Sequence, residues 1–307
     1  MNDKIKIATA NIRSLKKVEK ILYLRDICEK NKIDILFIQE THLNEDLFVN
    51  EVKKIFMNYS YFIPTLETSY KGVGILIKNN NKTDQIRHEI IDPNRLIITE
   101  IKINDSLISF VNNYSPNLAN EQMDFINLLY DTLIHNKNII VIGDFNHNIS
   151  DKNKNTFITK QWNEFYKNLS LKEFKFNEKI NESTVTWSNE NTATRIDRIY
   201  YSNNLKEKFD LQYNNILINI YSDHKIVIAD IVVKNVENLK IKPNFDNWKL
   251  NDTILNDEIV ISRMKDLCEE IGEYFDENNP SWYDFFINKV RRMLIHESIR
   301  IKKENER

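Results

Sequence analysis

The chain has 307 residues, of which 41% are hydrophobic and 29% are charged. These proportions lie in the globular range and exclude a wholly disordered or fibrous protein. The 43 basic and 45 acidic residues give a formal net charge of −2. The chain as a whole therefore lacks the basic signature of a nucleic-acid binder, and a basic groove would have to be local.

Two cysteines, Cys28 and Cys268, are too few and too far apart in the sequence for a disulfide framework or a zinc cluster. We expect both to be buried thiols in a reducing compartment. The first residues lack the apolar core of a secretory signal, and no apolar run approaches the roughly 20 residues that span a bilayer. The sequence therefore favours an intracellular protein with no membrane contact.

Short apolar runs alternate with amphipathic stretches along most of the chain. Residues 4–10 are typical of a strand, residues 18–28 of a helix, and residues 34–39 of a buried strand. Further strands are expected at 72–78, 95–103, 107–113, 138–143, 184–188, 195–201 and 225–233, and helices at 121–135 and 160–170. Strands outnumber helices, which predicts a sheet-rich, layered α/β fold.

The composition changes near residue 235. Residues 235–247 contain Pro243 and little periodicity, as a linker would, and two helices are expected after it, at 254–271 and from Ser281. We therefore expect a domain at residues 1–235 and a linker with a helical tail at 236–307. The basic end of the tail is either a solvated helix face or an arm that binds nucleic acid or a partner.

Polar side chains lie at the ends of the apolar strands, where α/β folds place their chemistry, and one acid, Asp197, lies inside an apolar segment. Taken singly, each could form a turn or cap a helix. Together, carboxylates, carboxamides, a tyrosine and a histidine supply oxygen ligands for Mg²⁺ and a cationic donor for a phosphate ester. The residues in question are Asn11, Glu40, Tyr114, Asp144, Asn146, Asp197, Ser222, Asp223 and His224.

Five segments carry a family resemblance: IQET (38–41), NYSPN (113–117), GDFN (143–146), RIDRIYYS (195–202) and SDH (222–224). In order and spacing they resemble the endonuclease/exonuclease/phosphatase superfamily, over residues 4–234. IQETHL (38–43), TWSN (186–189) and a Trp-containing tail resemble, more narrowly, the apurinic-endonuclease-like domain of LINE-type (non-LTR) retrotransposons. The resemblance implies a four-layered α/β sandwich of two packed mixed β-sheets flanked by helices, followed here by the helical tail.

The resemblance also implies catalytic and metal-binding roles. Glu40 and Asn11 would hold Mg²⁺, for which Mn²⁺ is an alternative, and Asp223 would support the metal site. Asp144 would activate the attacking water. Asn146 would position that water. Asp197 would fix the tautomer of His224, and His224 would contact the scissile phosphate. Tyr114 would contact the phosphate or its neighbours.

Further residues are expected to contact the substrate. Arg13 and Ser14 stand where many family members carry a glycine, and they either contact a phosphate or form the turn. Arg195 either reaches the nucleic-acid backbone or pairs with a surface acid. Asn117 and Ser222 complete the set.

The implied activity is a Mg²⁺-dependent DNA endonuclease that nicks one strand and leaves 3′-hydroxyl and 5′-phosphate ends, as the target-site nicking domain of a LINE-type retrotransposon. DNA is the expected partner, with a reverse-transcriptase module if the chain belongs to a longer polyprotein, and the location is nuclear if the host is eukaryotic. The alternatives are an abasic-site repair endonuclease, a phosphatase acting on lipids or inositol phosphates, and a catalytically inactive nucleic-acid-binding module.

Glycine is rare in this sequence, with four residues where average usage of about 7% would give roughly twenty. Gly72 and Gly74 lie in one predicted strand, where close packing or a bulge explains them. Gly143 directly precedes Asp144, which predicts an unusual dihedral angle or a close backbone approach at that turn.

Overall fold

The structure is a computed structural model of the whole chain. It describes residues 4–43, 46–64, 66, 71–80, 82–104, 106–147, 156–178, 180–181, 184–234 and 252–272, together with 290, 293–294, 297 and 300–301. The contacts divide the chain into two compact units, Met1–Val236 and Glu237–Arg307. Within the described part, no helix is long and apolar enough to cross a membrane.

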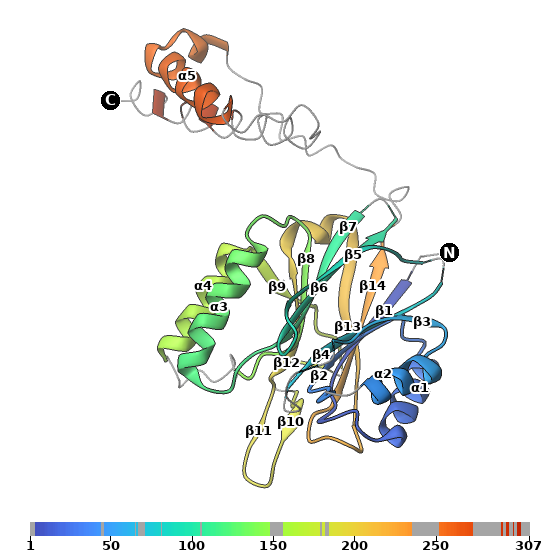
Figure 1. Cartoon of the computed structure of the whole chain (residues 1–307). Coiled ribbons are helices and arrows are strands. Elements are labelled where there is room, and N and C mark those ends of the chain that lie inside the picture. Colours follow the sequence, from blue (N-terminus) through green and yellow to red (C-terminus); the bar gives the residue numbers. More distant parts are fainter. Residues whose placement is uncertain are drawn as a thin grey trace. The chain divides into compact units, whose positions relative to one another are not determined.

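Two mixed six-stranded sheets form the centre of the first unit (Figure 1). In the first sheet, β1 (Lys4–Asn11) and β2 (Ile35–Gln39) are parallel and the other pairs are antiparallel. In the second sheet, β7 (Ser106–Tyr114) and β8 (Ile139–Asp144) are the parallel pair. The first sheet has the order β13 (Phe209–Leu217), β14 (Ile226–Val233), β1 (Lys4–Asn11), β2 (Ile35–Gln39), β4 (Val73–Lys78), β3 (Tyr59–Phe62). The second has the order β5 (Asp84–Asp92), β6 (Leu96–Ile103), β7 (Ser106–Tyr114), β8 (Ile139–Asp144), β12 (Asp197–Ser202), β9 (Leu171–Glu173).

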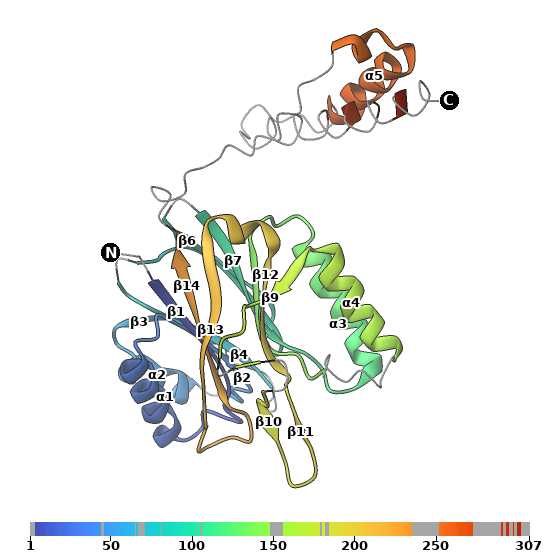
Figure 2. The ribbon, with the colours of Figure 1, turned by 180° about the vertical axis from the view of Figure 1, so that it is seen from behind.

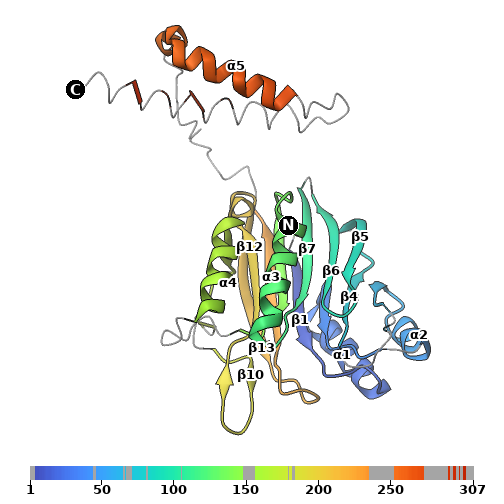
Figure 3. The same cartoon turned by 60° about the vertical axis from the view of Figure 1, so that its left-hand side comes forward.

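Helices cover the outer face of each sheet, so the first unit has four layers (Figure 3). Helices α1 (Val18–Asn31) and α2 (Asp46–Ile55) lie on the first sheet, and α3 (Ala119–Leu133) and α4 (Phe157–Asn168) on the second (Figure 2). The predicted four-layered sandwich is therefore confirmed. A short 3₁₀ helix, η1 (Asn203–Glu207), and a two-stranded hairpin, β10 (Trp187–Ser188) with β11 (Ala193–Thr194), complete the unit.

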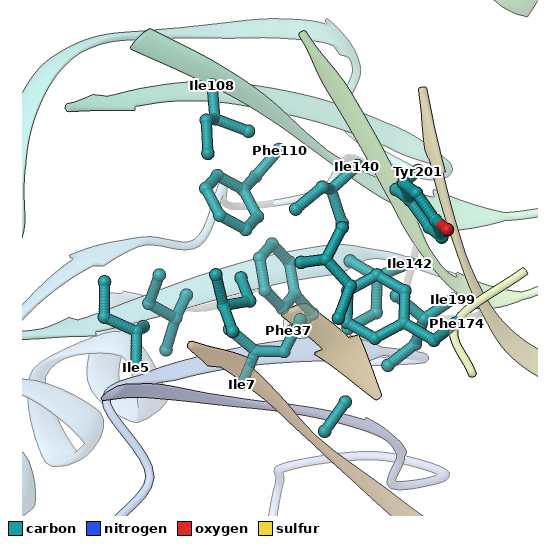
Figure 4. Packing of buried hydrophobic residues seen from close by; sticks show 14 of the residues in the cluster. Ile5, Ile7, Phe37, Ile108, Phe110, Ile140, Ile142, Phe174, Ile199 and Tyr201 are labelled. Carbon is teal, nitrogen blue, oxygen red and sulfur yellow. The ribbon is translucent and has the colours of Figure 1, made fainter. Parts of the chain in front are cut away.

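The main core lies between the two sheets (Figure 4). Phe37 from the first sheet and Phe110 from the second stack with ring centroids 5.9 Å apart. Both side chains are fully buried. Burial of such a side chain contributes roughly 1.5–3 kcal/mol, so the inner faces of the sheets hold the layers together and fix where their ends meet.

A polar bridge crosses the same interior. Gln39 at the end of β2 donates to Asn112 Oδ1 on β7 at 2.7 Å, and Asn112 in turn donates to the backbone oxygens of Ile38 and Gly74. Thr9 donates to the other side of the Gln39 amide at 3.0 Å. Because each buried amide is satisfied, this bridge fixes the register of the two sheets close to the ends of β1 and β2.

In the first unit the expected elements are present with shifted ends, except where the pattern was weak. The strand expected at 184–188 is reduced to β10, and sequence reasoning missed α2, β3, β5, β9 and β13. Edge strand β5 is mostly exposed where its side chains are described. Its sequence therefore lacks the alternation of apolar and polar residues that predicts a half-buried strand. Cys28 is buried as expected, but Cys268 is exposed, which corrects the expectation of two buried thiols.

The second unit contains a short 3₁₀ helix, η3 (Asp252–Asn256), and α5 (Glu258–Gly272), where a helix over 254–271 was predicted. The linker at 235–247 and most of the second predicted helix lie outside the described residues. In the basic segment near the chain end, Arg300 donates to Glu297 at 2.7 Å and to Asp257 at 2.9 Å. Arg300 thus has a structural role within its own unit.

Gly143 occupies the most demanding backbone position near the end of β8. Its φ is +142°, and a Cβ added there would lie 2.0 Å from the carbonyl oxygen of Asn113 on the neighbouring strand. The close approach predicted for this turn is therefore present, and Gly72, with φ +112°, combines close packing with a positive φ. Only a residue without a side chain fits at Gly143 without moving β7.

We expect Gly143→Ala to lower the free energy of unfolding by about 3 kcal/mol or more, because strain and a backbone clash add together. Gly74→Ala is the matched control, since its new Cβ would meet mainly the flexible side chain of Ile63, at 2.8 Å. Urea unfolding followed by circular dichroism measures both variants. Equal losses would contradict the conformational explanation.

Candidate active site

The predicted polar side chains meet at one edge of the sandwich, beside an open pocket of about 680 Å³. Asn11, Tyr114 and Asp144 end β1, β7 and β8, and Glu40 directly follows β2. Because these strands form the parallel pairs of the two sheets, their carboxyl ends share an edge. The pocket is lined, among others, by Arg13, Glu40, Asn117, Asn146, His147, Trp187, Asp223 and His224.

Asp197 and His224 form a buried acid–histidine pair. His224 Nδ1 lies 3.1 Å from each carboxylate oxygen of Asp197, and the two residues are only 1% and 5% exposed. Burial alone would lower the pKa of His224, but the charge of Asp197 and this hydrogen bond outweigh it and raise the pKa to about 9. His224 is therefore a fixed cation at neutral pH, with Nε2 directed away from Asp197.

Asp144 lies directly opposite Asp197 in the register of β8 and β12. Its carboxylate accepts hydrogen bonds from the Asn146 backbone N–H at 2.9 Å and from the Asn11 amide at 3.1 Å, and its Oδ2 lies 3.8 Å from His224 Nε2. Burial, reinforced by the charge of Asp197, raises the pKa of Asp144 although His224 and these hydrogen bonds favour its anion. Asp144 therefore readily holds a proton.

Glu40 differs, because three groups favour its anion. Tyr114 donates to Glu40 Oε1 at 3.0 Å, the Asn11 amide donates to the same oxygen at 2.8 Å, and His42 Nε2 lies 3.4 Å from Oε2. Burial would raise the pKa of Glu40, but the neighbouring His42 and the hydrogen bonds from Asn11 and Tyr114 lower it to about 2. The site thus offers a permanent carboxylate at the pocket wall.

Asn11 links these two carboxylates. Its amide nitrogen donates to both Glu40 and Asp144, and its amide oxygen accepts from the Arg13 backbone N–H at 3.2 Å. Asn11 is fully buried. In this arrangement it orients Glu40, and its expected part as a metal ligand stays a prediction.

Asp223 lies at the rim of the pocket. Its Oδ2 accepts from Trp187 Nε1 at 2.8 Å and pairs with Arg13 at 3.2 Å, while its buried Oδ1 has no hydrogen-bond partner among the described residues. Asn146 lines the pocket and donates to the Ser115 carbonyl at 2.8 Å. Asn117 lines it as well, so both asparagines are placed to meet a substrate.

Three expected substrate contacts are placed differently. The guanidinium of Arg195 is buried in an ion pair with Glu173 and a hydrogen bond to Tyr213, so in this structure it pairs with an acid. Ser222 Oγ accepts from the His224 backbone N–H at 3.2 Å, and Ser14 Oγ accepts from Lys16 N at 3.2 Å. Both serines stabilise turns, and neither lines the pocket described above.

Sequence reasoning missed two residues that hydrogen-bond to the backbone of the site residues. Thr186 Oγ1 accepts the backbone N–H groups of Ile196 and Asp197 at 3.1 and 3.0 Å, which fixes the start of β12. The TWSN segment contained this threonine but gave no sign of its role. Gln122 on α3 donates to the carbonyl of Asn146 at 3.2 Å, a contact for which the sequence offers no signal.

The donor set fits a hard divalent cation, which prefers carboxylate and amide oxygens. Glu40 is ionised, and the buried Asp223 Oδ1 is unpartnered among the described residues. Ligand atoms of Asp144, Asp197 and His224 also lie within 4.8 Å of one another. In that group His224 Nδ1 is already hydrogen-bonded to Asp197, so we favour Glu40 and Asp223 as the ligands.

The sandwich with a carboxylate and histidine cluster at the strand ends defines a hydrolytic, phosphoesterase-type class of protein. Comparison with protein families agrees, since residues 8–224 match the endonuclease/exonuclease/phosphatase family. The chain belongs to this family.

Solved structures with low sequence identity share the fold. The endonuclease domain of TRAS1, a telomere-specific non-LTR retrotransposon, is 16% identical, with a TM-score of 0.59 over 76% of this chain and 100% of that one. The AP endonuclease of Leishmania major is 16% identical, with a TM-score of 0.58 over 76% and 88%. The AP endonuclease of Archaeoglobus fulgidus is 21% identical, with a TM-score of 0.56 over 73% and 98%.

The raised pKa of His224 has a consequence for stability in the absence of metal. Because the folded pKa of about 9 exceeds the ordinary value of 6.5, the protonated ring stabilises the folded state fully below pH 6.5. That contribution is lost as the pH rises through about 9. In Asp197→Asn we expect the pKa of His224 to fall and the stability to vary less between these pH values.

NMR titration of the histidine ring signals in EDTA measures this pKa, and urea unfolding across the same pH range measures the stability. Asp131→Asn, a change at an exposed position on α3, is the control. An unchanged His224 titration in Asp197→Asn would refute the assignment of Asp197 as the cause.

Proposed function

We propose that the chain is a Mg²⁺-dependent DNA endonuclease that nicks one strand by phosphodiester hydrolysis and leaves 3′-hydroxyl and 5′-phosphate ends. The observation that carries this proposal is the buried Asp144–Asp197–His224 cluster at a pocket whose wall also presents the ionised Glu40. A protein that only bound nucleic acid would gain nothing from burying two acids side by side, because such burial costs stability.

Each residue has a distinct part in the proposed hydrolysis. Asp144 accepts the proton of the attacking water, and Asn146 helps to position that water. The water oxygen bonds to phosphorus, the bond from phosphorus to the 3′ oxygen breaks, and the 3′ oxygen takes up a proton from solvent water. His224, held by Asp197, directs its Nε2 proton toward a phosphate oxygen, where negative charge develops.

Glu40 and Asp223 would hold the Mg²⁺, with Tyr114 and Asn11 fixing the Glu40 carboxylate. When bound, the cation would supply charge neutralisation at the phosphate. Mn²⁺ has the same preference for oxygen ligands and is proposed as a substitute.

The biological setting is proposed on the likeness to the TRAS1 domain. In that setting the chain is the target-site nicking domain of a LINE-type retrotransposon, its partners are DNA and a reverse-transcriptase module, and it acts in the nucleus of a eukaryotic host. Similar folds also include AP endonucleases, so an abasic-site repair enzyme is the alternative.

Supercoiled plasmid tests the activity. We expect open-circular product with Mg²⁺ and none with EDTA, and a loss of about 10²- to 10⁴-fold in Asp144→Ala and in His224→Ala. The matched controls are Asp131→Ala and His135→Ala, both at exposed positions on or next to α3, which should retain the wild-type rate. DNA binding without cleavage in any metal would support the inactive module instead.

The same assay with an abasic duplex and with an inositol phosphate separates the alternatives. A strong preference for the abasic duplex would favour the repair enzyme, and release of phosphate from inositol phosphate alone would favour a phosphatase.

The ends of the nick provide an independent prediction. If the bond to the 3′ oxygen breaks, a DNA polymerase should extend the nick directly and DNA ligase should reseal it. We expect both reactions to proceed without prior treatment of the product. A nick that needs phosphatase treatment before extension would contradict the proposed direction of cleavage.

A further inference from the structure

The loop between β13 and β14 presents two isoleucines to solvent. Ile218 is 77% exposed and Ile220 is 71% exposed, whereas Asn219 between them is only 4% exposed. Exposed and buried positions thus alternate along residues 218–220. Two large apolar side chains displayed together form a surface that a partner would bury.

Contacts with α1 and within the loop hold the backbone around these isoleucines in place. Tyr23 on α1 donates its hydroxyl to the Ile218 carbonyl at 3.0 Å, and its ring meets that of Tyr221 edge to face with centroids 5.3 Å apart. Asn219 Oδ1 accepts from the Tyr221 backbone N–H at 3.1 Å. The loop backbone is therefore anchored, and the isoleucines stay exposed because their neighbours fix them there.

The loop is continuous with the candidate active site. It runs directly into Asp223 and His224, and the Ser188 backbone N–H of the β10–β11 hairpin donates to the Asp223 carbonyl at 3.3 Å. Figures 1 and 2 both show this loop and the hairpin side by side at the end of the sandwich. The loop therefore ends at the candidate active site, beside the hairpin that borders the pocket.

Cationic side chains lie beside the loop. Lys16 and Lys17 line a hollow together with Tyr221, and Arg13 pairs with Asp223 at the pocket rim. Glu19 is the acidic residue of the same hollow. Apolar side chains flanked by cations suit a nucleic acid, which presents phosphates at its edges and apolar base and sugar surfaces in its grooves.

On the basis of the proposed function, we propose that Ile218 and Ile220 form an apolar ridge that presses into the minor groove of duplex DNA beside the cleaved phosphate. Lys16 and Lys17 contact the adjoining backbone phosphates. Apolar side chains inserted at base steps partly unstack them and bend the duplex. The ridge thus favours a duplex that can be deformed next to the nick.

The test compares Ile218→Ala/Ile220→Ala with Met57→Ala in the full chain. Met57 is 79% exposed and belongs to the segment between α2 and β3, so it controls for loss of an exposed apolar side chain elsewhere. Duplexes carrying 2-aminopurine near the nick site report unstacking in EDTA, where cleavage does not interfere. Nicking of plasmid and hydrolysis of bis(p-nitrophenyl) phosphate are measured with Mg²⁺.

We expect the double variant to lose the 2-aminopurine signal and about tenfold of its duplex nicking, because two apolar contacts are removed. Hydrolysis of the small diester should remain at the wild-type rate, since that substrate does not reach the ridge. Met57→Ala should match the wild type throughout.

An unchanged 2-aminopurine signal in the double variant would overturn the proposal and leave the ridge as a surface for a protein. An equal fall in hydrolysis of the small diester would also overturn it, because the loop would then act only by placing His224. Ridge-dependent unstacking by a wild-type chain that nicks no DNA would refute the proposed function while supporting the ridge.

Discussion

The site depends on two carboxylates buried face to face. Asp144 and Asp197 are paired across β8 and β12, and each is 1% exposed. Two anions in that position repel each other strongly, and the repulsion is relieved only by a proton or a cation. His224 supplies one positive charge between them, so the cluster still carries an excess negative charge when both acids are ionised. Burial raises the pKa of Asp144 and this imbalance reinforces the shift, so Asp144 holds its proton more readily than an ordinary aspartate.

Much of the nearby structure serves to keep that arrangement in place. Asn113 donates its side-chain amide to the Asp144 carbonyl at 3.0 Å, and its own carbonyl lies where any side chain at Gly143 would project. Thr186 holds the backbone at Asp197 from the other side. These contacts use neutral donors and backbone atoms, so they fix positions without changing the charge of the cluster. A rigid frame of this kind is what electrostatic catalysis requires, because the groups are already oriented before a substrate binds.

How much the sequence could predict follows from the kind of signal each residue gives. Buried strands such as β2 and β8 are continuous apolar runs, so their ends, and with them Glu40 and Asp144, could be located. Arg195 could not be placed, because its partner Glu173 is distant in sequence and belongs to the three-residue strand β9, which has no recognisable pattern. Ser14 and Ser222 have residue types suited both to phosphate contacts and to turns, and only their local hydrogen bonds separate the two.

The hydrogen bonds of Asn11 explain why a carboxamide, and not a third acid, occupies this position between the two carboxylates. One NH₂ group donates to Glu40, which follows the first sheet, and to Asp144, which ends a strand of the second. An aspartate at this position would offer no donor and would add a charge beside two existing ones. A shorter hydroxyl residue has only one donor and could serve one carboxylate at a time. The amide therefore joins the carboxylate kept ionised to the carboxylate that accepts a proton, and it fixes their separation across the two sheets.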